Sequence, residues 1–232
     1  MTKIIINDIE IEVTKKNIKN VYLSVHSPNG QVRISAPKKM TDDDLRLFVV
    51  SKISWIKKQQ EKFENQEEIL EKEYISDESH YYFGKQYLLN VIYQKNNKSK
   101  VEIRSKKYID LYVKEGSNKA KRESIIKEWY RSELKEIIPL MIDKWERIME
   151  LQVEEWGVKK MKTRWGTCNP KAKRIWINLE LAKKPYYCLE YIIVHEMAHL
   201  LERGHGEKFK AVMDRYYPNW RNVKKELNGL RI

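Results

Sequence analysis

The sequence of 232 residues carries 46 Lys and Arg against 33 Asp and Glu, and 41% of its residues are hydrophobic. This length can bury one large core or two small ones, and no apolar run is long enough to cross a membrane. The N-terminus lacks the apolar region of a secretory signal, and Cys168 and Cys188 have neither metal-site spacing nor a disulfide framework, so we expect a cytoplasmic protein without membrane contact.

The first forty residues have the alternating pattern of strands. Residues 2–14 alternate loosely between apolar and polar side chains, which predicts one strand or a small hairpin. Residues 21–26 and 31–35 alternate cleanly on either side of Asn29-Gly30. Because this dipeptide is typical of two-residue hairpin turns, the two segments are predicted to pair.

A helix and two further strand regions follow. Thr41 and Asp44 form a capping pattern, so we expect a helix to begin there and to fade into a charged stretch by about Lys72. The segments 81–93 and 101–113 are predicted strand regions, joined by a polar turn. Nothing in this part of the sequence indicates chemistry.

A long helical pattern occupies the middle of the chain. Apolar residues recur at helical spacing over about 120–155, after a break at Gly116. Pro139 is expected to kink this helix or split it in two, and Gly157 is expected to end it.

The segments 158–164 and 174–179 are predicted to pair as strands around a turn at 168–171. A strongly apolar helix follows Pro185, and Gly204 is expected to end it in a left-handed conformation.

These elements indicate an α+β fold with a boundary near Gly116. Residues 1–116 form a β-rich N-terminal part with one helix. Residues 117–232 form a mostly helical part with a small β-sheet beside the apolar helix, and a shorter helix over 207–216 follows it.

The apolar helix carries the motif H-E-x-x-H, and three of the chain's five histidines lie within eleven positions of it. His195 and His199 are four residues apart, so they share one helix face and can reach one point. Glu196 lies about 100° round the helix from His195, close enough to reach a water on a metal ion held there without displacing a ligand. A turn at Gly204 would bring His205 in as a third ligand. Three protein ligands and an open position are typical of a catalytic zinc site.

The alternative is a buried helix whose histidines are satisfied by hydrogen bonds. That reading suits a single histidine better than three around a glutamate, because so much buried polarity is costly without partners. Imidazole nitrogens favour Zn²⁺ over Mg²⁺ or Ca²⁺, which prefer oxygen ligands. We therefore expect His195, His199 and His205 to bind Zn²⁺, and Glu196 to act as the general base on its water.

Several neighbours are candidates for supporting roles. Arg164, Tyr216 and Tyr217 could donate to the oxyanion of a tetrahedral intermediate, although packing and surface roles are the commoner ones. Glu202 could orient a ligand histidine or pair with a surface cation. Cys168 is better explained as a small buried residue than as a zinc-blocking thiol.

The stretch Lys162–Cys168, which reads K-T-R-W-G-T-C, resembles the T-R-W-G-S-C signature of the YgjP-like metallopeptidases, with Thr167 in place of the usual serine. These proteins are of the zincin type and share motifs with the SprT-like proteases. Glu202 stands where metzincins carry glycine, so the chain does not resemble that group. Further similarities, over nearly the whole chain, include Ile177-Asn178-Leu179, Pro185, Leu189-Glu190-Tyr191, Phe209 and Tyr217-Pro218-Asn219-Trp220.

The resemblance implies a zincin-like catalytic domain over 117–232 and a zinc-dependent peptidase that acts on proteins or peptides. Trp165 and Gly166 would then shape the cleft edge where an extended substrate adds as a strand, or simply anchor the core and relieve a turn.

A second function remains open because the net charge is +13 and residues 119–232 hold 25 Lys and Arg against 16 Asp and Glu. This balance allows weak nucleic-acid contact, so an SprT-like protein recruited to DNA-bound proteins, or one with a non-catalytic zinc site, is the alternative. Acidic residues separate the lysines, however, as on an ordinary soluble surface. A purely structural zinc site would also have no use for Glu196.

Overall fold

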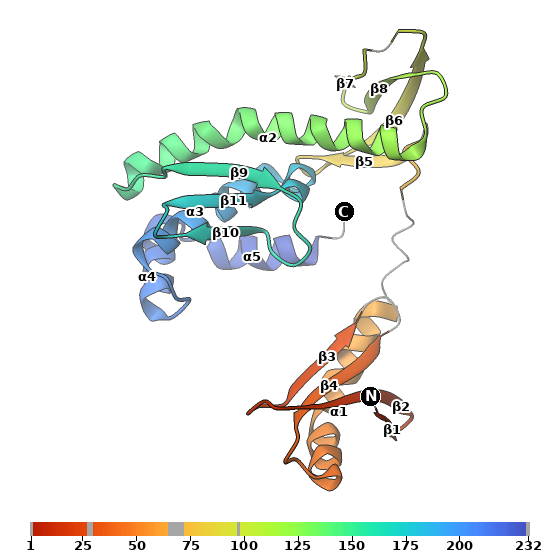
Figure 1. Ribbon diagram of the computed structural model, residues 1–232. Helices are drawn as coiled ribbons and strands as arrows, with labels where there is room; N and C mark the ends of the chain where they lie inside the picture. Colours follow the sequence, from red (N-terminus) through yellow and green to blue (C-terminus); the bar gives the residue numbers. More distant parts are fainter. Residues whose placement is uncertain (1, 27–29, 65–71, 97, 231–232) are drawn as a thin grey trace. The chain divides into compact units, whose positions relative to one another are not determined.

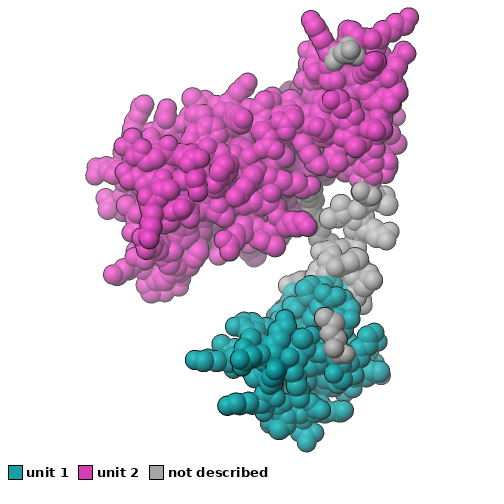
Figure 2. Space-filling model, viewed as in Figure 1, with its two compact units in different colours: residues 1–71 teal, residues 72–232 magenta. Residues whose placement is uncertain are grey.

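The computed structural model describes residues 2–26, 30–64, 72–96 and 98–230. The chain divides into two compact units, Met1–Glu71 and Lys72–Ile232, coloured separately in Figure 2. The expected boundary near Gly116 instead lies inside the second unit. The strands before Gly116 and the helix after it bury their apolar side chains in one common core, so no boundary falls there.

The first unit is a four-stranded sheet packed against one helix (Figure 1). The strand order is β1-β2-β4-β3, in which β2 and β4 are parallel and the two outer pairs are antiparallel. Leu45, Val49 and Ile56 of the helix share a core with alternate residues of the central strands. The elements are β1 (Thr2–Ile6), β2 (Ile9–Lys16), β3 (Tyr22–His26), β4 (Gln31–Pro37) and α1 (Asp42–Glu64).

The local predictions for this unit are confirmed where they can be followed. Residues 2–14 form the hairpin β1–β2, whose turn places Asn7 and Asp8 at positive φ. The backbone N–H of Asp44 donates to Thr41 Oγ1 at 3.1 Å, so the capping pattern does start the helix. Asn29 of the expected β3–β4 turn, and residues 65–71 of the expected helix end, lie outside the described residues.

The second unit combines two sheets with several helices, which confirms the α+β class. One sheet has the order β5-β6-β8-β7 and the other β10-β11-β9. None of the helices within the described residues is long and apolar enough to span a membrane. The elements are β5 (Ser79–Tyr82), β6 (Lys85–Gln94), β7 (Lys100–Arg104), β8 (Tyr108–Lys114), α2 (Lys119–Met149), β9 (Glu155–Lys159), β10 (Gly166–Asn169), β11 (Arg174–Asn178), the 3₁₀ helix η1 (Leu179–Lys183), α3 (Tyr186–Leu201), α4 (Glu207–Tyr216) and α5 (Trp220–Gly229).

The helix α2 corrects two expectations. Of the kink or split expected at Pro139, the split does not occur: the helix continues through the proline, because buried side chains on both sides of it hold the helix against the core. It ends at Met149 rather than at Gly157. The next residue, Glu150, adopts a left-handed conformation (φ 53°) and closes the helix. Gly157 lies instead in β9, where a Cβ would come within 2.3 Å of the Trp176 ring.

The small sheet also differs from the expected pairing of 158–164 with 174–179. The antiparallel partner of β11 is β10, and β9 lies on the other side of β11 in parallel. The segment between β9 and β10 is a loop, because these two strands lie on opposite sides of β11 and do not pair with each other.

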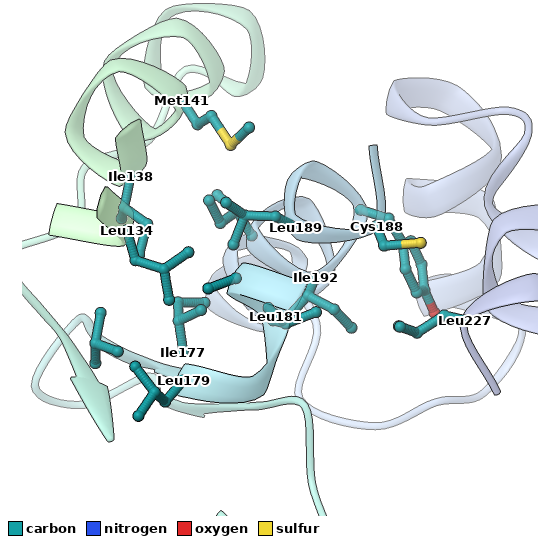
Figure 3. Close-up of a cluster of buried hydrophobic side chains, with 14 of the residues drawn as sticks. Leu134, Ile138, Met141, Ile177, Leu179, Leu181, Cys188, Leu189, Ile192 and Leu227 are labelled. Carbon is teal, nitrogen blue, oxygen red and sulfur yellow. The ribbon is translucent and has the colours of Figure 1, made fainter. Parts of the chain in front are cut away.

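The helix α3 lies at the centre of the second unit, in contact with α2, α4, α5 and β10. Its apolar side chains meet those of the surrounding elements in one cluster (Figure 3). The helix α5 is absent from the sequence-based description, although Trp220, Val223 and Leu227 repeat at helical spacing and are buried. The cluster includes Leu134 and Ile138 of α2, Ile177 of β11, Leu189 and Ile192 of α3, and Leu227 of α5.

The start of α3 is held by the turn between β5 and β6. The backbone N–H groups of Phe83 and Gly84 donate to the carbonyls of Ala182 and Lys183, at 2.9 and 3.1 Å. Gly84 has φ +78°, and a Cβ there would lie 2.8 Å from Pro185, the residue that precedes α3. The turn therefore needs glycine for its conformation and for its contact with the helix.

Two glycine substitutions separate these requirements. Gly116 has φ +77° and nothing within 4 Å of its Cβ position, so Gly116→Ala adds strain alone and should cost about 1 kcal/mol of unfolding free energy. We expect Gly84→Ala to cost a further ~1–3 kcal/mol because the new methyl group overlaps Pro185. Urea denaturation of both variants measures the difference, and equal losses would contradict the proposed contact.

Candidate metal centre

The middle of helix α3 is buried, and this burial fixes where its polar side chains point. From Cys188 to Ala198 every residue except Glu190 and His195 is buried. The helix can be so apolar because α2, α4, α5 and β10 surround it. Tyr191, His195, Glu196 and His199 of this helix line a cavity at its surface.

The structure brings the three histidines of the sequence motif together. Their candidate ligand atoms, one from each ring, all lie within 4.8 Å of one another. His195 Nε2 and His205 Nε2 are 3.2 Å apart, close to the roughly 3.3 Å between two nitrogens on a tetrahedral zinc with bonds of about 2.0–2.1 Å. The three rings are therefore grouped closely enough that they could hold one metal ion.

The turn that places His205 differs from the expected one. Gly204 is not at positive φ, and α3 ends at Leu201 because Glu202 adopts an extended conformation (φ −141°). The Glu202 carboxylate then accepts a bond from the backbone N–H of Gly204, at 3.4 Å. An extended residue followed by this local hydrogen bond redirects the chain towards the end of α3.

Glu202 also contacts a histidine, but through its backbone. His199 Nδ1 lies 3.1 Å from the Glu202 carbonyl oxygen, which can accept a bond only from a protonated Nδ1. That tautomer leaves Nε2 of His199 with a lone pair for a metal. The Glu202 side chain forms no ion pair with Arg203 or Lys208 among the residues described.

Phe209 of α4 forms the floor beneath the three imidazoles, a role that its helical spacing does not reveal. Its ring centroid lies 4.9 Å from that of His195, 4.6 Å from that of His199 and 4.9 Å from that of His205. Phe209 is 2% exposed. Its ring therefore excludes water from one side of the histidine cluster.

Burial keeps two of the histidines neutral. It lowers the pKa of His195 to about 3 and also lowers that of His199. The Nδ1 atom of His195 is buried without a hydrogen-bond partner among the described residues, so packing against Tyr191 and Phe209 orients this ring. Neutral imidazole is the form that binds a metal, and three such nitrogens suit a transition metal better than Mg²⁺ or Ca²⁺.

Glu196 faces the same cavity from a tightly enclosed position. The residue is 5% exposed, and burial raises the pKa of its carboxyl to about 8, against the opposing charge of Arg164. A Cβ at Gly166, the first residue of β10, would lie 2.6 Å from Glu196 Oε1. Only glycine at this position lets β10 approach α3 without displacing the carboxylate.

The loop before Gly166 is anchored by Asn178, which sequence reasoning took only as part of a family pattern. Its side-chain amide donates to the carbonyls of Met161 and Arg164, at 3.0 and 2.7 Å, and its oxygen accepts from the N–H groups of Met161 and Glu180. Asn178 is 3% exposed, and all its hydrogen-bonding capacity is used. One buried side chain thus fixes the loop that carries Arg164 and Trp165.

The cavity above the histidines has a volume of about 620 Å³. Residues 163–168, α3, the segment after it, and Lys224, Leu227 and Asn228 of α5 line it. Arg164 is among the lining residues, whereas Tyr216 and Tyr217 are not. Tyr217 instead donates its hydroxyl to the Tyr187 carbonyl, at 3.2 Å.

Cys168 also lines the cavity, but burial raises the pKa of its thiol to about 11. It is therefore a neutral thiol near pH 7, and a thiolate is the form that binds metals.

The Glu196 carboxyl predicts a specific pH dependence for the metal-free protein. The pKa of this carboxyl is about 8 in the folded state and 4.5 ordinarily, so the folded protein binds an extra proton between these limits. Stability should therefore fall as pH rises from about 6.5 to 8, a window above the ordinary pKa of histidine. The urea midpoints of chelator-treated wild type and Glu196→Gln, measured across this pH range, test the prediction. The midpoint should fall with pH in the wild type only, and an equal fall in both proteins would contradict it.

Comparison with known proteins agrees with the family resemblance that was noted from the stretch Lys162–Cys168. The YgjP-like family profile, described as "YgjP-like, metallopeptidase domain", matches residues 19–230. No curated protein matches the chain. The metallopeptidase zymogen of Pyrococcus abyssi abylysin is 16% identical, with a TM-score of 0.37, over 39% of this chain and 90% of that one. The zymogen of Methanocaldococcus jannaschii jannalysin is 19% identical, with a TM-score of 0.36, over 40% and 94%. The chain belongs to the YgjP-like metallopeptidases, a family whose members act on peptide bonds with a metal cofactor.

Proposed function

We propose that the protein is a zinc-dependent peptidase in which His195, His199 and His205 hold the metal and Glu196 is the general base. The convergence of three imidazole rings beside one buried carboxylate carries this proposal. Three nitrogen ligands leave a fourth position of a tetrahedral ion for water or substrate.

A bound zinc ion supplies Lewis-acid polarisation of the peptide carbonyl and lowers the pKa of water to about 7. The Glu196 carboxylate accepts the proton of the attacking water and then donates it to the nitrogen of the departing amine. The positive charge of a metal favours the ionised carboxylate, which offsets the effect of burial on its pKa. Glu196 therefore starts the reaction as a base.

The surroundings of Glu196 support this role. Gly166 leaves the space that the carboxylate occupies, and Phe209 shields the histidines from one side. Among the three candidates for oxyanion stabilisation, Arg164 is favoured because its side chain lines the cavity and its charge acts on Glu196.

The free edge of β10 supports a peptide as the substrate. β10 pairs with β11 on one side and has no partner on its other side within the described sheet. Gly166, Thr167 and Cys168 of this strand line the cavity. An extended peptide can add to such an edge through backbone hydrogen bonds, with its scissile bond near the histidines.

A nucleic-acid-associated role is a second proposal, supported by charge. The unit Lys72–Ile232 holds 34 Lys and Arg against 22 Asp and Glu, whereas Met1–Glu71 holds 12 against 11. The excess of positive charge therefore lies in the unit that contains the histidines. Such a surface favours nucleic acid and acidic proteins alike.

The variant Glu196→Gln tests the proposed reaction. We expect kcat/KM on a peptide library to fall by about 10²–10⁴-fold, since the amide cannot accept the proton, while one zinc ion per chain is retained. Activity of the wild type should disappear with a chelator and return with zinc. Glu207→Gln, at an exposed carboxylate on α4, is the matched control. Full activity of Glu196→Gln, or chelator-resistant cleavage by the wild type, would contradict the proposal.

A further inference from the structure

The charged side chains around the cavity are of one sign. Arg164, Arg203 and Lys224 line it, and Glu196 is the only carboxylate among the described lining residues. Because Glu196 is 5% exposed and belongs to the proposed catalytic group, it does not balance the three cations. A substrate that enters the cavity therefore meets positive charge.

These three cations are accessible to a ligand, although Lys224 also lies over the Trp220 ring, 5.8 Å from its centroid. Each is exposed, and none forms an ion pair or a side-chain hydrogen bond with another residue in the part of the chain that the structure describes. Some basic residues elsewhere on the same unit are paired, as Arg221 is with Asp214 and Lys144 with Glu190. An unpaired cation at the rim of a cavity is in place to attract an anionic group.

The cations come from three separate parts of the fold. Arg164 belongs to the loop anchored by Asn178, Arg203 to the segment between α3 and α4, and Lys224 to α5. Two of them also act on the proposed catalytic group, because the charge of Arg164 acts on Glu196 and that of Lys224 acts on His195. A peptide bound across the site can thus place acidic side chains near more than one of them.

We propose that the cavity selects acidic peptides, with Asp or Glu side chains on either side of the scissile bond held by Arg203 and Lys224. This inference rests on the proposed peptidase function and adds a substrate class to it. A peptide is favoured over nucleic acid because the cations surround a concave site of about 620 Å³, whose floor carries the proposed catalytic groups. Extended nucleic-acid surfaces instead present their cations along the path of a backbone.

The test uses the zinc-loaded full chain and peptides of equal length with blocked ends, which differ only in carrying Glu, Gln or Lys around one cleavage site. An exposed ion pair changes kcat/KM by about two- to fivefold, so two pairs should favour the Glu peptide over the Lys peptide by on the order of tenfold at low salt. Screening should reduce this ratio as salt increases.

Charge-reversal variants assign the preference to the cavity. Arg203→Glu and Lys224→Glu should each lower the Glu-to-Lys ratio of kcat/KM by on the order of fivefold, because attraction becomes repulsion. Lys225→Glu is the matched control, since Lys225 is an exposed neighbour on α5 that does not line the cavity, and it should leave the ratio unchanged. Zinc content and circular dichroism confirm that each variant is folded.

The outcomes separate the two proposals. Chelator-sensitive cleavage without preference for the Glu peptide, or an equal change of the ratio in Lys225→Glu, would overturn the acidic-substrate inference and leave the peptidase intact. Absence of chelator-sensitive cleavage of every peptide would overturn the peptidase itself. Tight binding of a single-stranded oligonucleotide with steep salt dependence, lost in Arg203→Glu and Lys224→Glu and combined with no peptide preference, would assign these cations to nucleic acid instead.

Discussion

The burial of α3 is the constraint on which the rest of the site depends. An apolar helix in the middle of a domain must be covered on nearly every side, and here α2, α4, α5 and β10 cover it. His195, Glu196 and His199 are left at a cavity, where their polar atoms are only partly hydrated. The depressed pKa of His195 and the raised pKa of Glu196 both follow from this partial burial.

Two small features turn that buried helix into an organised centre. Gly166 lets the edge strand lie against Glu196, so the carboxylate is enclosed without being displaced. Asn178 uses all its hydrogen bonds on the preceding loop and on η1, so the wall that carries Arg164 is fixed by the same strand that pairs with β10. The close approach of the Gly166 backbone and the fully hydrogen-bonded Asn178 amide therefore position the site. The exposed cations Arg164, Arg203 and Lys224 lie around it.

The sequence predicts those parts of the site that depend on local spacing. The pair His195 and His199 follows from one helical turn, and the start of α3 follows from Pro185. The convergence of His205 was expected, but its route was not, because the extended conformation of Glu202 depends on contacts at the end of α3. The meeting of Gly166 with Glu196 joins residues thirty positions apart, which no local period can reveal.

Propensity rules also fail where burial outweighs them. Pro139 does not divide α2, since core packing on both sides of it offsets the lost backbone hydrogen bond. The boundary expected at Gly116 is an exposed glycine turn between elements that share one core, because a local break in secondary structure does not separate packed layers. The helix α5, which supplies Lys224 to the cavity, was not predicted, although Asn219 stands at its N-cap and its buried stripe is regular.

The central claim is that three imidazoles share one zinc ion beside Glu196. X-ray absorption at the zinc edge of the stoichiometrically loaded protein tests it most directly. Nitrogen and oxygen neighbours alone, at about 2.0–2.1 Å and with one fewer imidazole in His205→Ala, are the predicted result. A sulfur neighbour at about 2.3 Å, which Cys168 would supply, or a coordination shell unchanged in His205→Ala, would contradict the account.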